Sequence, residues 1–403
     1  MTSKPQFVGE RVQVSDAFDL RMGKTPSRKN PSYWRDGNHD WVSIADLSAF
    51  GKYVGRTKER INDLAISESG IKPAPANTVL MSFKLSLGKA SITTNPVYTN
   101  EAIMAFVDMG TYPVDPCFMY HQCRAKNWAA KTNRAVMGET LNKKTLSQAL
   151  IYLPKLNKQK EIANKLDYID EQIAVAGKVV SNLDALVKSR FVEMFGDTQH
   201  EHKTLSECCD YTAGGATPSM KHEEYYDGEI PFIKSGDVKG DIVERGALTL
   251  TEAALQHGGA KLIPGDSVLV VTRSALLKRK LHVALAPDPV VINQDIKAFH
   301  PHDGVLSSYL MWAIRSREVE LLHGVRSVNT SSIKTSDLFS MDIPLPSLAL
   351  QQEFADFVAQ VDKPRFVALI LRERIVTCAR NSLANSSFPK TSSTTSFWRC
   401  KPL

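Results

Sequence analysis

Cysteine and long apolar runs are both scarce in this sequence. Its 403 residues include 6 cysteines, too few for the disulfide framework that holds small secreted domains together. No apolar run approaches the ~18 residues that a membrane-spanning helix needs. The first twenty residues also lack the apolar stretch of a signal peptide. These absences exclude disulfide scaffolds and helical membrane proteins, and we expect a cytoplasmic chain with no membrane partner.

The charge balance permits an anionic partner without demanding one. Lysine and arginine number 50 against 43 aspartates and glutamates, and 43% of the residues are apolar. Such a chain is globular and long enough for two or three domains. Residues 1–152 hold 20 basic and 13 acidic side chains, whereas residues 203–345 hold 15 and 18. Only the first segment therefore has the positive surplus that is typical of a phosphate-binding surface.

The chain repeats itself once, with a period of about 192 residues. The string Gly-Lys-Thr-Pro-Ser at residues 23–27 returns as Gly-Ala-Thr-Pro-Ser at residues 215–219. Further matches follow in the same order: Lys72 and Lys261, Val79 and Val268, Asn100 and Asn293, Phe106 and Phe299, Gln159 and Gln351, and Glu161 and Glu353. An order kept over so many positions indicates a tandem duplication.

Each repeat begins with about 150 residues of short β-rich segments. Runs rich in Val, Ile and Phe alternate with Gly and Pro clusters, as strands joined by turns do. Strands are predicted over residues 41–47, 78–83 and 102–107, and over residues 230–233, 267–272 and 295–299. The predicted fold class is α+β, with two tandem β-rich α/β domains separated by long helices.

The remainder of the first repeat predicts one long helix. No proline interrupts residues 161–195, and 35 helical residues would extend ~52 Å. Its expected mate is the equivalent helix of the second repeat, packed antiparallel so that the domains lie around an approximate two-fold axis. Apolar residues at alternating spacings of four and three predict a coiled-coil seam: Ile162, Leu166, Ile169, Ile173, Val180, Leu183 and Val187, with Phe354, Val358 and Val361 in the second helix.

The second helix departs from the first in its sequence. Pro364 falls inside it and removes a backbone hydrogen-bond donor, so we expect the helix to be damaged there. Residues 386–403 are rich in Ser and Thr without an apolar period, which predicts a disordered tail. The expected division is a first domain over 1–152, a central helical spacer over 153–200, a second domain over 201–345, a distal spacer over 346–385, and the tail.

Motifs for catalysis are incomplete. The Asn-Pro strings at Asn30 and Asn95 are similar to the motif with which DNA methyltransferases grip an amino group, but no glycine-rich turn for a nucleotide-like cofactor is present. Asp288 and Asp295 imitate a metal-dependent nuclease core. Cys117, His121 and Cys123 lack the second pair of ligands that a zinc site needs. We expect no catalytic residue, metal or cofactor on this chain, and an N6-adenine methyltransferase or nuclease with unrecognised motifs is an alternative.

Two similar but non-identical domains held apart by helices fit double-stranded DNA. Half-site spacing on DNA mirrors the spacing of protein modules, and one duplex turn covers ~34 Å. Each domain could then read a few base pairs on either side of an unread spacer. Because the two domains differ in sequence, their half-sites should differ. A scaffold that joins two modules without binding DNA is the other alternative.

The combination of strings resembles a known family over about residues 10–365. The duplicated Gly-x-Thr-Pro-Ser strings, the Leu-Pro pairs ending at Pro154 and Pro346, the Gln-x-Glu helices after them, and the string at residues 186–191 are similar to specificity subunits of type I restriction–modification systems. The resemblance implies a non-catalytic chain with two target-recognition domains. It further implies docking of methyltransferase and translocase/nuclease subunits, which would use S-adenosylmethionine, ATP and Mg²⁺.

No motif locates the DNA-contact residues. Long basic side chains in loops that flank strands are the physical candidates, because Arg and Lys pair with phosphates and guanine edges. The predicted contacts are Lys24, Arg28, Lys84, Lys89, Lys131 and Arg134 in the first domain, and Arg273, Lys278, Arg279 and Arg326 in the second.

Overall fold

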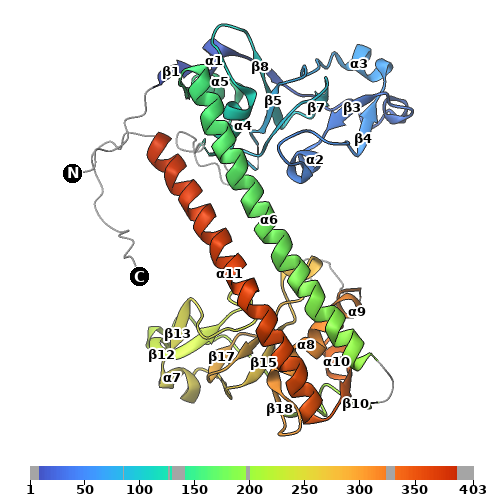
Figure 1. Cartoon of the computed structure of the whole chain (residues 1–403), viewed down its shortest axis with the longest axis vertical. Coiled ribbons are helices and arrows are strands. Elements are labelled where there is room, and N and C mark those ends of the chain that lie inside the picture. The colour runs from blue at the N-terminus through green and yellow to red at the C-terminus, as the bar shows by residue number, and fades with distance from the viewer. Residues whose placement is uncertain are drawn as a thin grey trace, which may run out of the picture. The chain divides into compact units, whose positions relative to one another are not determined.

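Figure 1 shows the computed structural model of the chain. It describes residues 9–84, 86–125, 128, 141–196, 200–323 and 332–387, with side chains as far as residue 374. The chain divides into two compact units, Met1–Val175 with Leu371–Leu403, and Ala176–Ile370. No helix within the described residues has the length and apolarity to cross a membrane.

The described residues of the first unit form three small sheets. The largest has the order β2-β8-β5-β6, the second the order β4-β3-β7, and the third pairs β1 with β9. Their strands are β1 (Glu10–Gln13), β2 (Phe18–Met22), β3 (His39–Val42), β4 (Glu59–Ile61), β5 (Val79–Ser82), β6 (Ala90–Ile92), β7 (Tyr98–Thr99), β8 (Ile103–Asp108) and β9 (Leu150–Leu153). The helices are α1 (Val14–Ala17), α2 (Ile44–Ala49), α3 (Asp63–Ser69), α4 (Pro116–Ala125) and α5 (Lys143–Ser147), with a 3-10 turn at Pro31–Trp34.

The second unit repeats this topology. Its sheets have the orders β11-β18-β15-β16, β13-β12-β17-β14 and β10-β19. Their strands are β10 (Glu201–Thr204), β11 (Cys209–Gly214), β12 (Tyr226–Ile233), β13 (Leu248–Leu250), β14 (Leu262–Ile263), β15 (Ser267–Val271), β16 (Val283–Ala286), β17 (Val290–Ile292), β18 (Ile296–Pro301) and β19 (Asp342–Leu345). The helices are α7 (Glu252–Gln256), α8 (Ser307–Ser316), α9 (Glu318–His323) and α10 (Thr335–Phe339), with 3-10 turns at Glu223–Tyr225 and Ala275–Lys278. The predicted α+β class and tandem duplication are confirmed.

The Gly-x-Thr-Pro-Ser string has the same structural cause in both units. A Cβ atom on Gly23 would lie 2.2 Å from the Thr99 and Asn100 carbonyl oxygens, and one on Gly215 would lie 2.0 Å from the Ile292 oxygen. Only glycine allows so close an approach of two backbones. The string therefore holds the end of β2 or β11 against the end of β7 or β17.

The predicted strand over residues 41–47 ends early. β3 stops at Val42 because Ser43 and Asp46 form a capping box, in which the Ser43 side chain accepts from the Asp46 amide and Asp46 accepts from the Ser43 amide. Reciprocal capping of this kind starts a helix. Residues 44–49 accordingly form α2, and the prediction of a strand there was wrong.

A buried glutamine fastens each long helix to its domain. Gln159 is the fourth residue of α6 (Leu156–Phe195), and Gln351 is the fourth of α11 (Leu348–Ser387). The Gln159 amide donates to the Pro113 and Pro154 carbonyls and accepts from the Asp115 amide. The Gln351 amide does the same with Gly304, Pro346 and Leu306. The repeated glutamine is thus a structural clamp.

α6 and α11 pack against each other in the second unit. Phe191 and Phe195 of α6 contact Phe354 of α11 with ring centroids 5.4 and 5.5 Å apart, and Arg365, further along α11, pairs with Asp184, earlier in α6. This order of contacts is antiparallel. Of the predicted seam residues, Val187, Phe354, Val358 and Val361 are buried in the core of this unit and Leu183 packs against it, Ile162 packs on the first unit's core, and Leu166, Ile169, Ile173 and Val180 are half-buried.

Pro364 does not damage the second helix. α11 is continuous through it and has 40 residues, the same length as α6 (Figure 1). Proline removes one hydrogen bond from a long ladder. Packing holds the helix on both sides, because Val361 and Ala368 are buried and Arg365 forms ion pairs with its surroundings. The expected defect was wrong. Of the predicted disordered tail, residues 386 and 387 belong to α11, and residues 388–403 lie outside the described residues.

Candidate nucleic-acid interface

Arg28 follows the first Gly-x-Thr-Pro-Ser string and has partners within its own domain. Its guanidinium lies 3.7 Å from the Trp34 ring centroid, and it donates to both Glu59 carboxylate oxygens at 2.5 and 2.8 Å. The hydrogen bond to Glu59 raises the pKa of Arg28, against a smaller opposing effect of burial. A bidentate pair of this kind fixes the guanidinium plane, so a DNA contact by Arg28 would have to share or replace Glu59.

The other predicted lysines of the first domain are also engaged in part. Lys24 donates to the Ser69 carbonyl at 2.5 Å, and Lys89 donates to the Ser48 hydroxyl at 2.7 Å. The Lys84 ammonium lies 5.4 Å from the Phe83 ring centroid. Lys131 and Arg134 lie outside the described residues. These bonds are exposed and weak, so each lysine can exchange its partner for a phosphate.

The connection between β15 and β16 holds three adjacent cations that have no hydrogen-bond or ion-pair partner within the described residues of the second domain. The Ser274 side chain caps the 3-10 turn Ala275–Lys278, and Leu277 is buried beneath it. Lys278, Arg279 and Lys280 follow and are exposed. Among the described residues, none of these three side chains forms a hydrogen bond or ion pair. A capped, anchored turn therefore displays three adjacent positive charges on a domain with excess negative charge.

The remaining predictions for the second domain have different surroundings. Arg273 donates to Asp295 at 2.6 Å, while Arg326 lies outside the described residues. Lys280 was not among the predicted contacts, although it belongs to the same basic run as Lys278 and Arg279. The position of Lys280 in this basic run would have been enough to predict it as a contact.

The side chains that follow the two Gly-x-Thr-Pro-Ser strings differ in chemical character. Met220 occupies the position of Arg28 after the second string and is 73% exposed. Tyr226, in the place of Trp34, donates to the Pro218 carbonyl at 2.6 Å, and Leu248 stands at the start of β13 where Glu59 starts β4. The first region thus holds an arginine between a carboxylate and an aromatic ring, whereas its counterpart exposes a methionine at the arginine's position.

Charged side chains fasten the first domain to α6. Asp167 accepts from Lys52 at 2.5 Å and contacts His121 at 2.8 Å, while Arg124 pairs with Asp170. Burial raises the pKa of Asp167, but the hydrogen bonds from Lys52 and His121 lower it by a larger amount. The net shift of this pKa is therefore downward. Burial lowers the pKa of His121 more than Asp167 raises it, so His121 is neutral at pH 7.

A more buried ionic group fastens the second domain to α11. Arg315 pairs with Asp241 at 2.7 Å, and Arg365 pairs with Asp241, with Asp184 at 2.9 Å and with Asp362 at 3.2 Å. Burial raises the pKa of Asp241, but the two arginines lower it by more. Burial and the nearby Asp241 charge raise the pKa of Asp362.

Three residues of the catalytic-looking strings have hydrogen-bond or ion-pair partners within the chain. The Asn30 side chain accepts from the Ser32 amide at 3.2 Å and caps the turn Pro31–Trp34, and Asp295 is paired with Arg273. His121 is bonded to Asp167. The described residues contain no cluster of three or more His, Cys, Asp or Glu able to hold a metal ion.

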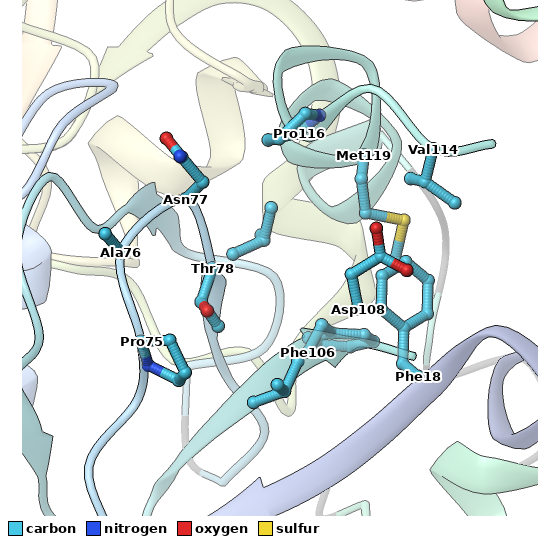
Figure 2. Close-up of a pocket in the computed structure, with 12 residues that line it drawn as sticks. Phe18, Pro75, Ala76, Asn77, Thr78, Phe106, Asp108, Val114, Pro116 and Met119 are labelled. Atoms are coloured by element: carbon cyan, nitrogen blue, oxygen red, sulfur yellow. The ribbon is translucent and has the colours of Figure 1, made fainter. Parts of the chain in front are cut away.

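A cavity of about 250 Å³ opens in the first unit (Figure 2). Its walls are mainly apolar: Phe18 of β2, Val79 of β5, Phe106 of β8, Pro116 and Met119 of α4, and Pro75 and Val114 of the connecting segments. In the second unit, Ser307 at the start of α8 donates to the Asp266 carbonyl at 2.7 Å. Pro116 begins α4 at the corresponding place and has no hydroxyl, so this bridge is missing from the first unit.

Curated relatives match parts of the chain. The EcoR124I/EcoR124II specificity subunit of Escherichia coli is 34% identical over 170 residues, which is 42% of either chain. The MjaIX specificity subunit of Methanocaldococcus jannaschii is 32% identical over 37% of this chain and 35% of its own length. The chain thus spans less than half of the length of each of these two relatives. The MjaVIII specificity subunit of the same archaeon is 23% identical over 88% of this chain and 86% of its own.

Solved structures share the fold over nearly the whole chain. The S subunit of a type I restriction–modification system from M. genitalium has a TM-score of 0.53 at 13% identity, covering 97% of this chain and 99% of its own. A chain from a study of assembly and conformational transition of the type I R-M system has a TM-score of 0.54 at 16% identity, covering 94% and 97%. The profile of the type I restriction modification DNA specificity domain matches residues 10–180 and 199–370. The chain belongs to this family and carries its domain twice.

Proposed function

We propose that this chain is the specificity subunit of a type I restriction–modification complex. It reads an asymmetric, bipartite target in double-stranded DNA and holds the methyltransferase and restriction subunits. The chain itself is not catalytic, and S-adenosylmethionine, ATP and Mg²⁺ are used by the other subunits. It works in the cytoplasm, where the host DNA is.

One observation carries this proposal: the DNA specificity domain occurs twice, with one strand topology but two different exposed regions after the Gly-x-Thr-Pro-Ser string. Arg28 and Trp34 can offer hydrogen bonds and a stacking surface, whereas Met220 offers apolar contact such as a thymine methyl group accepts. Domains that differ in this way select different bases. Two such domains in one chain give a target with two unlike halves.

The cations of Lys278, Arg279 and Lys280 suit the phosphate backbone. Phosphate contacts position a protein on DNA and make its affinity fall with salt, by roughly one unit of log–log slope per phosphate. We therefore assign to this loop the role of positioning the second domain on the DNA backbone. Base discrimination in the second half-site comes from other side chains of that domain.

The test is the adenine-methylation map of a methylation-free host that expresses this chain with the methyltransferase encoded beside it. A new, split and asymmetric motif is expected. Absence of any motif in a host where both proteins are present and associated would contradict the specificity role and favour the scaffold alternative. Methylation by this chain without its partner would instead favour the methyltransferase alternative.

Direct DNA binding tests the loop. The double variant Lys278→Ala/Arg279→Ala should bind a target duplex about tenfold or more weakly and lower the salt slope by about 2. The matched control is Lys239→Ala/Lys261→Ala, which removes the same charge from exposed positions of the same domain. Equal losses of DNA affinity in the two double variants would show that the loop acts only through the charge of the domain and makes no phosphate contact of its own.

A further inference from the structure

Glu101 and Gln294 occupy the same position of two matching turns, one between β7 and β8 and the other between β17 and β18. In each turn an asparagine side chain accepts from the amide two residues on, and its carbonyl accepts from the amide three residues on. These bonds measure 3.1–3.3 Å and join Asn100 with Ala102 and Ile103, and Asn293 with Asp295 and Ile296. The residue directly after the asparagine is exposed in both turns. The same backbone contacts therefore present a glutamate on one domain and a glutamine on the other.

The Gly-x-Thr-Pro-Ser string holds each of these side chains. The Thr25 hydroxyl donates to a Glu101 carboxylate oxygen, and the Thr217 hydroxyl donates to Gln294 Oε1 at 2.7 Å. The string reaches the turn because its glycine lies so close to the backbone at the end of the preceding strand. A side chain that is already held at one atom loses less conformational freedom when its other atoms bind a ligand. The repeated threonine therefore orients a different polar group in each domain.

The two polar groups differ in what they can recognise. An ionised carboxylate only accepts hydrogen bonds, whereas a glutamine amide offers an acceptor and two donors. The hydrogen bond from Thr25, with smaller contributions from the Glu101 amide and the Lys84 charge, lowers the pKa of Glu101, so this carboxylate is ionised at pH 7. The Gln294 amide nitrogen donates to no group in the part of the chain that the structure describes. In the major groove a carboxylate accepts from the cytosine N4 amino group, and a glutamine pairs with adenine N6 and N7.

A cation lies beside each turn. The amide of the residue before this cation donates to the carbonyl of the last turn residue, at 3.0 Å from Phe83 to Ala102 and at 2.8 Å from Thr272 to Asp295. Lys84 and Arg273 therefore follow at equivalent positions. The Lys84 charge acts on Glu101, and Arg273 donates to Asp295 of the turn at 2.6 Å. Because phosphate contacts set the register in which nearby side chains meet base edges, a cation at this place suits a turn that reads a base.

This inference rests on the specificity role proposed above: we propose that Glu101 and Gln294 each determine one base of the two half-sites. Glu101 accepts a hydrogen bond from a cytosine amino group, and Gln294 pairs with an adenine. Thr25 and Thr217 are positioning residues that act through these two side chains. The halves of the target therefore differ at an equivalent position, because a glutamate reads it in one domain and a glutamine reads it in the other.

Reciprocal exchange of the two residues tests the assignment. Glu101→Gln should change the accepted base from cytosine to adenine at one position of one half-site, and Gln294→Glu should make the opposite change in the other half-site. Adenine-methylation maps of a methylation-free host that expresses each variant with the methyltransferase measure both changes. The second unit shows that a threonine hydroxyl holds a glutamine at this turn, so the fold accommodates the exchange. The control Glu10→Gln, at an exposed position of β1, should keep both half-sites.

The map of the unmodified chain separates this inference from the specificity role. A split motif that the unmodified chain produces and both exchanges leave unchanged would overturn the assignment of Glu101 and Gln294, while the specificity role would stand. The absence of any motif from the unmodified chain would contradict the specificity role itself.

Thr217 provides a second test, because its hydroxyl is exposed and orients Gln294. In the purified complex with the methyltransferase, the unmodified chain should bind its target about tenfold more tightly than a duplex with cytosine in place of the adenine that Gln294 reads. Thr217→Val should reduce this ratio to about threefold or less, and Thr217→Ser, which keeps the hydroxyl, should retain it. A ratio that stays unchanged in Thr217→Val, even if the affinity for both duplexes falls, would overturn the positioning role.

Discussion

The two units share one backbone plan but stabilise the contact between domain and helix with different chemistry. In the first, a lysine and a neutral histidine share Asp167. In the second, two arginines share Asp241, and Trp312 replaces the histidine. The features that recur, a glycine, a glutamine and the order of strands in the sheets, are those that set the geometry. The side chains that face solvent or a partner differ between the copies. The duplicated units therefore share their backbone geometry but not the chemistry of their surfaces.

The largest expected effect tests the shared frame. Gln351→Leu should destabilise the second unit by about 3 kcal/mol, because three hydrogen bonds are lost and the partly buried Leu306 amide is left without its acceptor. Gln159→Leu should cost the first unit a similar amount. Denaturant unfolding of both variants measures this. Costs that differ by more than about 2 kcal/mol would show that the two clamps are not equivalent.

The second-largest loss of stability is expected when the glycine of a repeated string is replaced. Gly215→Ala places a methyl group 2.0 Å from the Ile292 oxygen, and relief of that overlap by backbone shifts costs about 2–3 kcal/mol. Gly51→Ala is the control, since its added Cβ would meet nothing within 4 Å. If Gly215→Ala unfolds at the same denaturant concentration as Gly51→Ala, the close approach is not a constraint.

Acid should act differently on the two contacts between domain and helix, one made through His121 and the other through Asp241. The folded pKa of His121 is lowered, so the unfolded chain takes up this proton first as pH falls below the ordinary imidazole pKa of about 6.5. The contribution is full above that pH and is lost as pH falls towards the folded pKa. The Tm of the first unit should decline as pH falls below about 6.5, and His121→Gln should reduce this decline. The link made by Asp241, whose pKa is lowered, should hold until carboxylates titrate below about pH 4.

The smallest effect concerns the cavity of the first unit. Pro116→Ser gives α4 the residue that begins α8, whose hydroxyl donates to a carbonyl across this region. A gain of about 0.5–1 kcal/mol is expected from one added hydrogen bond. Ser307→Ala in the second unit should lose a similar amount. A stabilised Ser307→Ala protein would contradict the idea that this bridge accounts for the difference.

Much of the frame could be predicted from the sequence. The ordered matches of Gly23 with Gly215 and Gln159 with Gln351 indicated the duplication, because a backbone that needs a glycine or a buried amide at one place needs it in every copy. The long run of apolar residues at helical spacing predicted α6. Residues 44–47 were mistaken for part of a strand, since the apolar pattern outweighed the capping signal of Ser43 and Asp46.

Tertiary structure alone decided which charges are free and which are paired. Arg28 and Lys278 are both basic loop residues in the sequence, but Arg28 is held by Glu59 and Trp34, while Lys278 lies on an anchored turn without a partner among the described residues. The same holds for Pro364, where local propensity predicted a break and packing on both sides keeps the helix continuous. Local sequence determines backbone needs because they are short-range. The fate of a charge or a proline depends on neighbours far away in the chain, which only the fold brings together.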